Sequence, residues 1–363
     1  MTNQKSVLLA MSGGLDSSVS AMLLKQQNFA LTGMTFRSYD SISKACMEKE
    51  NGCCSVDAIF EAKKLADDLG FPHHILDTRQ LFENTVINDF ISQYMGGFTP
   101  NPCVLCNKII KWGKMMEECD KLHCDYLATG HYAQIGFENG RYFLKKGVDK
   151  SKDQTYFLWT LTQDNLRRTI FPLGSLTKPQ VREIARENTY EKIAQKRESQ
   201  EICFITDNDY RSFLREKVSD IDRQTGEGNF VDKSGKIIGK HKGYPFYTIG
   251  QRKGLVVAFG TPKYVCHINA QTNEIVLGDK EDLLSNSLII KQYNLMKYDK
   301  IPANFTGEVK IRYKDKGQIA TINQYDDYIK ITFKESVSAI TPGQSAVIYE
   351  NDDVVAGGVI FNE

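Results

Sequence analysis

The most constraining feature of this chain is a glycine-rich loop between a strand and a helix near its N-terminus. The apolar strand Ser6–Ala10 runs into Ser12-Gly-Gly-Leu-Asp-Ser17, and apolar residues then recur at helical spacing over residues 17–25. Gly13 and Gly14 permit backbone angles and close approaches that a side chain would forbid. The helix start presents unpaired N–H groups and the positive end of its dipole to the loop. The string therefore predicts a phosphate-binding loop.

This loop differs from the commonest nucleotide-binding signature, because it lacks the lysine that a GxxxxGK(S/T) loop uses for the outer phosphates. It resembles instead the SGGxDS loop of ATP pyrophosphatases, which cleave between the α and β phosphates and transfer AMP to an oxygen. Ser12 and Ser17 supply hydroxyl donors, and Asp16 is suited to holding Mg²⁺ or capping the helix. An ordinary Ser/Gly turn is the alternative, but the complete strand–SGGLDSS–helix string favours a nucleotide site.

The composition is that of a globular protein. The chain has 363 residues, enough for two or three domains, with 41% hydrophobic and 25% charged residues. Lys+Arg 46 against Asp+Glu 45 leaves a formal charge of +1, so any nucleic-acid site is a local basic surface. No apolar run approaches the roughly 20 residues of a membrane span, and the first strand begins too early for a signal peptide. We expect a cytoplasmic protein.

The first two hundred residues alternate strands and helices, which predicts a doubly wound α/β domain over residues 1–208. We expect buried strands at 6–10, 30–36, 73–77 and 125–129, and helices at 17–26, from about 55, and from 178 with Thr177 as its N-cap. Ligands of such domains lie beyond the carboxyl ends of the strands. The glycine-rich loop, Phe36 and Gly130-His131 all fall at such ends.

The pattern of residue types along the chain changes after about residue 208. Glycines punctuate short β-prone pieces, which predicts a small β-rich central module over residues 209–275. From residue 276 to 363, alternating stretches such as 329–334 and 345–349 predict a C-terminal β-barrel.

The nine cysteines of the chain suggest thiol chemistry or metal binding rather than structural disulfides. Asn101-Pro-Cys-Val-Leu-Cys-Asn107 contains a Cys-x-x-Cys, which serves as a redox pair, half of a zinc site, or two ligands of an iron–sulfur cluster. It is also compatible with two buried thiols that have no chemical role. Cys203 gains weight from its combination with this motif, whereas Cys119, Cys124 and Cys266 sit in ordinary contexts.

Taken together, these strings make the chain resemble the tRNA-specific 2-thiouridylases, which replace the C2 oxygen of a wobble uridine with sulfur. The resemblance spans nearly the full length and rests on residues 10–17, Ala128-Thr-Gly-His-Tyr132, Lys152-Asp-Gln-Thr-Tyr-Phe157, Tyr247-Thr-Ile-Gly-Gln-Arg-Lys-Gly-Leu255, Ile311-Arg-Tyr313 and Ala339-Ile-Thr-Pro-Gly-Gln-Ser-Ala346. It implies a transferase that uses ATP and Mg²⁺ to adenylate the C2 oxygen, with AMP and pyrophosphate as products.

The resemblance also implies roles for individual residues. ATP binding falls on Ala10, Met11, Ser12, Gly13, Gly14, Leu15, Asp16, Ser17, Phe36 and Gly130. Cys203 receives sulfur as a persulfide, and Cys106 is the second catalytic thiol, so that a Cys106–Cys203 disulfide remains after transfer. Asn101, Pro102 and Cys103 meet the target base. Contacts to tRNA fall on His131, Lys152, Asp153, Gln154, Arg312, Tyr313 and Gln344.

The implied partners are tRNA, with lysine, glutamate and glutamine tRNAs as substrates, and a sulfur-donor protein. The donor is a cysteine desulfurase or a persulfide relay protein, and the enzyme is expected to act as a monomer. Arginine, lysine and tyrosine also suit phosphate contact and base stacking on general grounds.

One residue departs from the family pattern: Cys103 stands where many relatives carry aspartate. The three cysteines Cys103, Cys106 and Cys203 are therefore also candidate ligands of a 4Fe–4S cluster that performs the same reaction. Two further hypotheses are a different adenylating enzyme with an SGGxDS loop and a non-catalytic RNA-binding protein with a relic ATP loop. The intact loop, together with Cys106 and Cys203, argues against the second of these.

Overall fold

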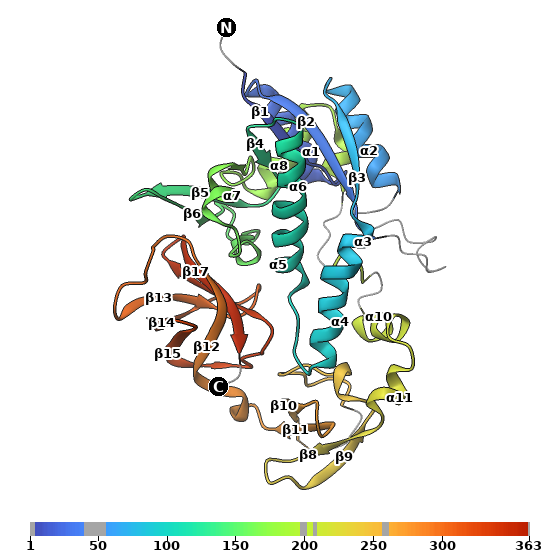
Figure 1. The fold of residues 1–363 in the computed structure, drawn as a ribbon, viewed down its shortest axis with the longest axis vertical. Coiled ribbons are helices and arrows are strands. Elements are labelled where there is room, and N and C mark those ends of the chain that lie inside the picture. The colour runs from blue at the N-terminus through green and yellow to red at the C-terminus, as the bar shows by residue number, and fades with distance from the viewer. Residues whose placement is uncertain (1–3, 40–55, 197–201, 206–208, 256–260, 362–363) are drawn as a thin grey trace.

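The computed structural model describes residues 4–39, 56–196, 202–205, 209–255 and 261–361. Cys46, Cys53 and Cys54 lie outside these described residues. The chain forms an α/β domain, a small β-rich module and a barrel, in the order that the sequence predicts (Figure 1). Within the described part, no helix is long and apolar enough to cross a membrane.

A five-stranded parallel sheet forms the centre of the first domain. Its order is β3-β2-β1-β4-β7, from β3 (His73–Asp77), β2 (Ala30–Arg37), β1 (Ser6–Ala10), β4 (Tyr126–Ala128) and β7 (Thr169–Ile170). Alternate residues of β1 point to opposite faces, as the pleat requires. Val7 and Leu9 pack with α1 (Leu15–Gln26), α2 (Val56–Asp68) and α8 (Lys178–Glu187), whereas Leu8 packs with α6 (Met115–Lys121). The sheet is covered on both faces, so the prediction of a doubly wound domain is confirmed.

One expectation about this sheet is wrong. Residues 73–77 form a strand as predicted, but β3 is an edge strand rather than a buried one, and the side chain of Ile75 is 57% exposed. Only β2 pairs with it, so one of its sides has no neighbouring strand in the described sheet.

Two long helical columns extend from the carboxyl side of the sheet (Figure 1). The first joins α3 (Arg79–Phe82), the π-helical η2 (Glu83–Ile87) and α4 (Asn88–Met95). The second joins α5 (Pro102–Cys106), the π-helical η3 (Asn107–Lys114) and α6. Among the described residues, this domain also contains the helices η4 (Thr155–Phe157), α7 (Gln163–Arg167) and α9 (Glu191–Ala194).

The central module begins with α10 (Tyr210–Lys217) and α11 (Ile221–Thr225). Its four-stranded sheet has the order β10-β11-β8-β9, from β8 (Gly228–Val231), β9 (Ile237–His241), β10 (Tyr264–Asn269) and β11 (Glu274–Gly278). The short helices η5 (Tyr244–Phe246) and η6 (Glu281–Leu283) complete the connections.

The C-terminal barrel closes through six antiparallel strands. They follow the order β12-β15-β14-β13-β16-β17, and β12 pairs again with β17. The strands are β12 (Leu284–Leu295), β13 (Phe305–Lys310), β14 (Gln318–Gln324), β15 (Ile329–Ser338), β16 (Ser345–Glu350) and β17 (Asp353–Phe361). The predicted barrel is therefore confirmed.

An unpredicted hairpin links the first domain to this barrel. Strands β5 (Ala133–Glu138) and β6 (Arg141–Lys146) belong to the first domain, but Lys145 of β6 pairs with Asp353 of β17. A single hydrophobic cluster also contains residues of both domains: Leu8, Leu127, Phe143, Leu144, Trp159, Met296, Val347 and Tyr349 are among its members. The two domains therefore share a core.

Candidate active site

The glycine-rich loop adopts a conformation that only glycine accommodates at its second position. Gly13 has a φ of 67°, and a Cβ atom there would lie 2.3 Å from the carbonyl oxygen of Ala58 in α2. Ser12 N–H donates to Ser17 Oγ at 3.1 Å, and that hydroxyl donates in turn to the Gly14 carbonyl at 3.2 Å. The loop is thus braced against the first turns of α1 and α2. Since the first N–H groups of a helix lack intrahelical partners, α1 offers them to an anion at this loop.

Asp16, in the first turn of α1, is held by two residues from distant segments. Lys178 Nζ lies 2.7 and 2.9 Å from the carboxylate oxygens, and Tyr132 Oη donates to the same carboxylate at 2.8 Å. Lys178 is only 7% exposed. The ammonium group therefore compensates the Asp16 charge immediately beside the loop that is expected to bind polyphosphate.

A second lysine also contacts the loop. Lys196 Nζ donates to the Gly13 carbonyl at 2.6 Å and also forms an ion pair with Glu61 of α2. Sequence reasoning identified neither Lys178 nor Lys196. Both come from segments more than 160 positions away in the chain from the loop residues that they contact, and no local pattern marks them.

The other residues expected at the ATP site lie at the carboxyl ends of β1, β2 and β4. A Cβ atom on Gly130 would lie 3.0 Å from Ser17 N, so the chain after β4 packs against the first turn of α1. Phe36 is half-buried near the end of β2. The side chains of Met11 and Leu15 are buried in the core beneath the loop. These two residues can therefore contact a nucleotide only through their backbone groups.

Cys103 and Cys106 lie on the short helix α5, which begins at Pro102. Residues three apart share one face of a helix, so both thiols point to the same side. Both are half-buried, and Cys106 packs against a hydrophobic cluster that includes Phe82 and Phe90.

Cys203 is exposed, but its neighbour Phe204 anchors it to that same cluster. The Phe204 ring lies 5.2 Å from Phe90 and 5.7 Å from Phe82, between ring centroids, and it is 2% exposed. The cluster therefore brings the Cys106 and Cys203 segments to one part of the molecule. No three His, Cys, Asp or Glu side chains of the described residues gather as a metal site would require.

Two of the remaining described cysteines, Cys119 and Cys266, have thiols with raised pKa values. Cys119 is buried and donates to the Cys124 carbonyl at 3.3 Å, and its hydrogen bond with Cys124 and its burial raise the pKa of the thiol. Burial also raises the pKa of Cys266. A raised pKa lowers the thiolate fraction, so neither Cys119 nor Cys266 is suited to nucleophilic chemistry.

His131 is buried beside the end of β4 and makes two hydrogen bonds. Lys111 Nζ lies 3.3 Å from Nε2, and Thr129 Oγ1 lies 2.8 Å from Nδ1. An ammonium group only donates, so Nε2 accepts and Nδ1 carries the proton. Burial, with Lys111 next, holds the pKa of His131 well below its usual range. The ring is therefore neutral at pH 7.

The expected RNA contacts between residues 152 and 154 differ in exposure. Asp153 is 5% exposed and accepts from Thr155 Oγ1 at 2.8 Å and from Gly147 N–H at 3.2 Å, which fixes the loop around it. Gln154 Oε1 accepts from Tyr132 N–H at 3.0 Å. Lys152 is only half-buried. Of the three residues, Lys152 is the one best placed to meet a phosphate.

The expected contacts on the barrel lie at its edge facing the first domain. Arg312 is exposed, and the ring centroid of Tyr313 lies 4.5 Å from that of Phe157. Tyr313 lies in a turn after β13 rather than on a strand. Gln344 Nε2 donates to the carbonyls of Thr99 and Pro100 at 3.1 and 2.8 Å, so the barrel fixes the segment that leads to Asn101.

Comparisons with known proteins cover all three domains. Family models match residues 5–207 (tRNA methyl transferase HUP domain), 212–279 (tRNA methyl transferase PRC-barrel domain) and 285–360 (aminomethyltransferase beta-barrel domain). The tRNA-specific 2-thiouridylase MnmA of Amoebophilus asiaticus is 48% identical over 98% of this chain and 94% of its own length. The protein of the same name from Cytophaga hutchinsonii is 46% identical over 99% of this chain and 98% of its own.

Similarity to solved structures is weaker. A 4-thiouridine synthetase in complex with RNA and ATP covers 55% of this chain and 45% of its own, at a TM-score of 0.35 and 17% identity. The assignment to a family rests on the curated relatives and the family models.

Proposed function

The chain belongs to the tRNA-specific 2-thiouridylase family, and from this premise we propose that it is a tRNA-uridine 2-sulfurtransferase that consumes ATP. The observation that carries the proposal is the pairing of a braced SGGLDS loop with two thiol segments on one hydrophobic cluster. The substrate is the wobble uridine of lysine, glutamate and glutamine tRNAs.

The first half of the reaction activates the uridine. Its C2 oxygen is a poor leaving group, so it attacks the α-phosphate of ATP and pyrophosphate departs. The N–H groups at the start of α1 and the hydroxyls of Ser12 and Ser17 hold the departing pyrophosphate. Lys178 and Lys196 add positive charge at the loop. Asp16 is already paired with Lys178, so it would be a weak ligand for Mg²⁺, whose contribution would be to neutralise the phosphate charge.

The second half transfers sulfur. A donor protein, a cysteine desulfurase or a relay protein, leaves a persulfide on Cys203, whose exposure suits such a delivery. The terminal persulfide sulfur attacks C2 and expels AMP. The Cys106 thiolate then attacks the Cys203 sulfur, so the S–S bond breaks toward the uridine, which becomes 2-thiouridine, and a Cys106–Cys203 disulfide remains. A cellular thiol reductant restores both thiols.

The test is nucleoside mass analysis of unmodified lysine tRNA after incubation with ATP, Mg²⁺ and a persulfide source. We expect 2-thiouridine from the wild type and from Cys266→Ala, and none from Cys106→Ala or Cys203→Ala. Both inactive variants should still release pyrophosphate in the presence of tRNA, because adenylation precedes sulfur transfer. Thiolation by either variant would refute the assigned thiol roles, and the absence of product from the wild type would refute the substrate.

A second candidate performs the same reaction through a 4Fe–4S cluster on Cys103, Cys106 and Cys203. The observation in its favour is that Cys103 shares the helix face of Cys106. The described cysteines do not gather as a metal site here, so the residues as placed do not fit a cluster. Replacing Cys103 with aspartate separates the candidates, because the persulfide route predicts retained activity. Loss of both iron and activity in Cys103→Asp, with activity only after anaerobic iron reconstitution of the wild type, would favour the cluster.

A further inference from the structure

The side chain of Lys111 links the neighbourhood of the glycine-rich loop to the helical column that carries Cys106. Its Nζ lies 3.3 Å from Nε2 of His131. His131 follows Gly130, and a Cβ atom on Gly130 would lie 3.0 Å from Ser17 N in the first turn of α1. Lys111 itself belongs to η3, which continues the helix that carries Cys106. The ammonium group therefore lies where the phosphate-binding segments and the thiol-bearing column meet.

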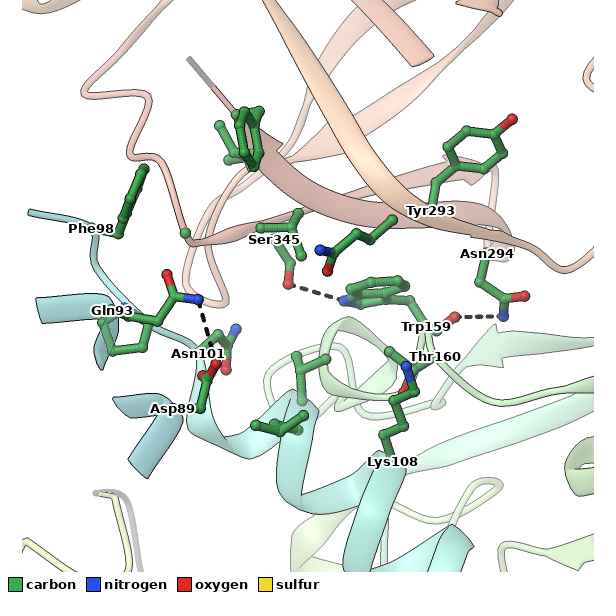
Figure 2. A pocket seen from close by; sticks show the side chains of 18 of the residues that line it. Asp89, Gln93, Phe98, Asn101, Lys108, Trp159, Thr160, Tyr293, Asn294 and Ser345 are labelled. Carbon is green, nitrogen blue, oxygen red and sulfur yellow. Dashed lines mark hydrogen bonds between the residues drawn. The ribbon is translucent and has the colours of Figure 1, made fainter. Parts of the chain in front are cut away.

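The π-helical geometry of η3 decides which face of the column Lys111 occupies. At about 100° per residue, an α-helix would place Lys111 about 140° around the axis from Cys106. A π-helix bonds residue i to residue i+5, so its wider turn brings Lys111 back toward the direction of Cys106. Lys108, by contrast, lines a pocket of about 660 Å³ between α4, α5 and the barrel strands β12 and β17 (Figure 2), and Lys111 does not line it. Lys111 thus belongs to the face of the thiols.

The charge of Lys111 is not compensated by a carboxylate within the described part of the chain. Lys178, which is buried beside the loop, pairs with Asp16 at 2.7 Å. Lys111 is half-buried, and its hydrogen-bond partner among the described residues is the neutral ring of His131. An ammonium group has three N–H donors, of which His131 accepts one. The two other donors, and a charge partly removed from water, favour an anionic ligand at this point.

His131 is held in the orientation that presents an acceptor to this ammonium group. Thr129 Oγ1 lies 2.8 Å from the protonated Nδ1, which leaves Nε2 as the acceptor. The ring is 8% exposed, and its centroid lies 5.6 Å from that of Trp112 and 6.3 Å from that of Phe171. Trp112 is itself fixed, because its indole N–H donates to Thr169 Oγ1 at 2.8 Å. The imidazole therefore cannot turn away without breaking these contacts.

We propose that the Lys111 ammonium group contacts the α-phosphate of ATP during adenylation of the uridine, and that His131 positions this group. The proposal rests on the proposed function and adds a catalytic residue to its first half. In that step the bond from the C2 oxygen to the α-phosphorus forms, and the bond from that phosphorus to pyrophosphate breaks, with its electron pair leaving on the pyrophosphate oxygen. The loop holds the departing pyrophosphate, so the α-phosphate needs a cation of its own. A cation fixed before the reaction stabilises the charge of the transferred group in the transition state.

The first test measures pyrophosphate release by Lys111→Met at saturating tRNA and varied ATP. We expect kcat to fall about 100-fold, as it does when one charge-stabilising donor is removed, and KM for ATP to change less than about threefold. Lys111→Arg keeps the charge and should retain more activity than Lys111→Met. Lys114→Met is the matched control, because Lys114 lies on the same helix and pairs with Glu117 at 2.7 Å. This control should react like the wild type.

ATP with sulfur in place of a non-bridging α-phosphate oxygen identifies the phosphate that Lys111 contacts. Sulfur is a weak hydrogen-bond acceptor, so the substitution should slow the wild type more than Lys111→Met, in which the contact is already lost. For the more affected diastereomer, the ratio of the rates with ATP and with the sulfur analogue should be about five- to tenfold larger in the wild type.

Variants of His131 test its positioning role. His131→Leu removes the acceptor and should lower kcat about tenfold, whereas His131→Gln offers an amide oxygen and should recover most of that loss. Combined with Lys111→Met, His131→Leu should cause no further loss, because both changes remove the same contact. Additive losses in the double variant would mean a merely structural histidine and would overturn this role.

Three results would overturn the role of Lys111. They are an unchanged kcat in Lys111→Met, an equal effect of the sulfur analogue on wild type and variant, and a loss confined to KM for tRNA. The last of these would indicate an RNA phosphate as the ligand instead of the α-phosphate. Pyrophosphate release by the wild type that does not depend on tRNA would overturn the proposed function itself, so the two failures are distinguishable.

Discussion

Replacing Gly13 with alanine tests whether the loop geometry is as restrictive as its structure indicates. At a φ of 67°, an alanine costs about 1–2 kcal/mol relative to its favoured conformations. Its Cβ would also lie 2.3 Å from the Ala58 carbonyl oxygen, a backbone atom that moves only if α2 moves. Overpacking of this kind costs about 1–3 kcal/mol. The sum is about 2–5 kcal/mol, a large part of the stability of a domain.

Gly14→Ala is the matched control. Gly14 has a φ of −83°, and the nearest atom to an added Cβ is Ser12 Oγ at 3.4 Å. Neither backbone strain nor overlap is expected, so this substitution should change the free energy of unfolding by less than about 1 kcal/mol.

The measurement is the thermal unfolding midpoint of the two variants, with ATP binding measured on the folded protein. A loss of about 2–5 kcal/mol corresponds to a fall of roughly 4–20 °C for a domain of this size. Gly13→Ala should also bind ATP more weakly, because the loop and α2 must separate. Equal midpoints for the two variants, or a larger loss for Gly14→Ala, would refute the geometric argument.

Three further outcomes are expected. Burial lowers the pKa of His241 to about 4, so between pH 4 and 6.5 the unfolded chain binds a proton that the folded chain does not. On acidification through this range, the free energy of unfolding should fall by up to about 1.4 kcal/mol per pH unit. His241→Gln should reduce this pH dependence, as measured by urea unfolding. Lys178→Met should weaken ATP binding about tenfold by leaving the Asp16 charge uncompensated, and adding Asp16→Asn should restore part of the affinity; a weaker double variant would contradict this. If the Tyr313 ring, which packs against Phe157 in a tilted arrangement, also stacks on a base, Tyr313→Ala should weaken tRNA binding about tenfold in a filter-binding titration, and Tyr313→Phe should not.

The features that sequence reasoning predicts correctly are those encoded over short distances. The glycine-rich loop, the parallel strands and the Thr177 helix start each depend on neighbouring residues, and Thr177 N–H indeed donates to Gln180 Oε1 at 2.8 Å. The barrel is predictable for the same reason, since alternation along each strand is local. The β5–β6 hairpin also has a local signal, although it is not among the predicted elements. Asn139 and Gly140 have φ angles of 50° and 79°, as a tight two-residue hairpin turn requires.

The remaining features could not be predicted because they depend on the order of strands and on distant segments. The exposure of Ile75 follows from the edge position of β3, which the residues of that strand do not encode. Lys178 and Lys196 reach the loop only after folding brings α8 and the end of α9 beside α1. The pocket of about 660 Å³ that Asn101, Thr160 and Asn294 help to line likewise combines residues of the helical columns, the segment 159–162 and the barrel.

The core shared between the first domain and the barrel has a consequence for how this chain divides into parts. Arg141 of the hairpin donates to the carbonyls of Leu295 and Met296, and Trp159 packs with Val347 and Tyr349. A fragment that ends before β12 would expose this apolar surface to water and leave β6 paired only with β5, without β17. The first domain and the barrel occupy separate stretches of the sequence, but each needs the other to keep its apolar surface out of water. A gene truncated after the central module should therefore yield an aggregating product rather than a smaller working enzyme.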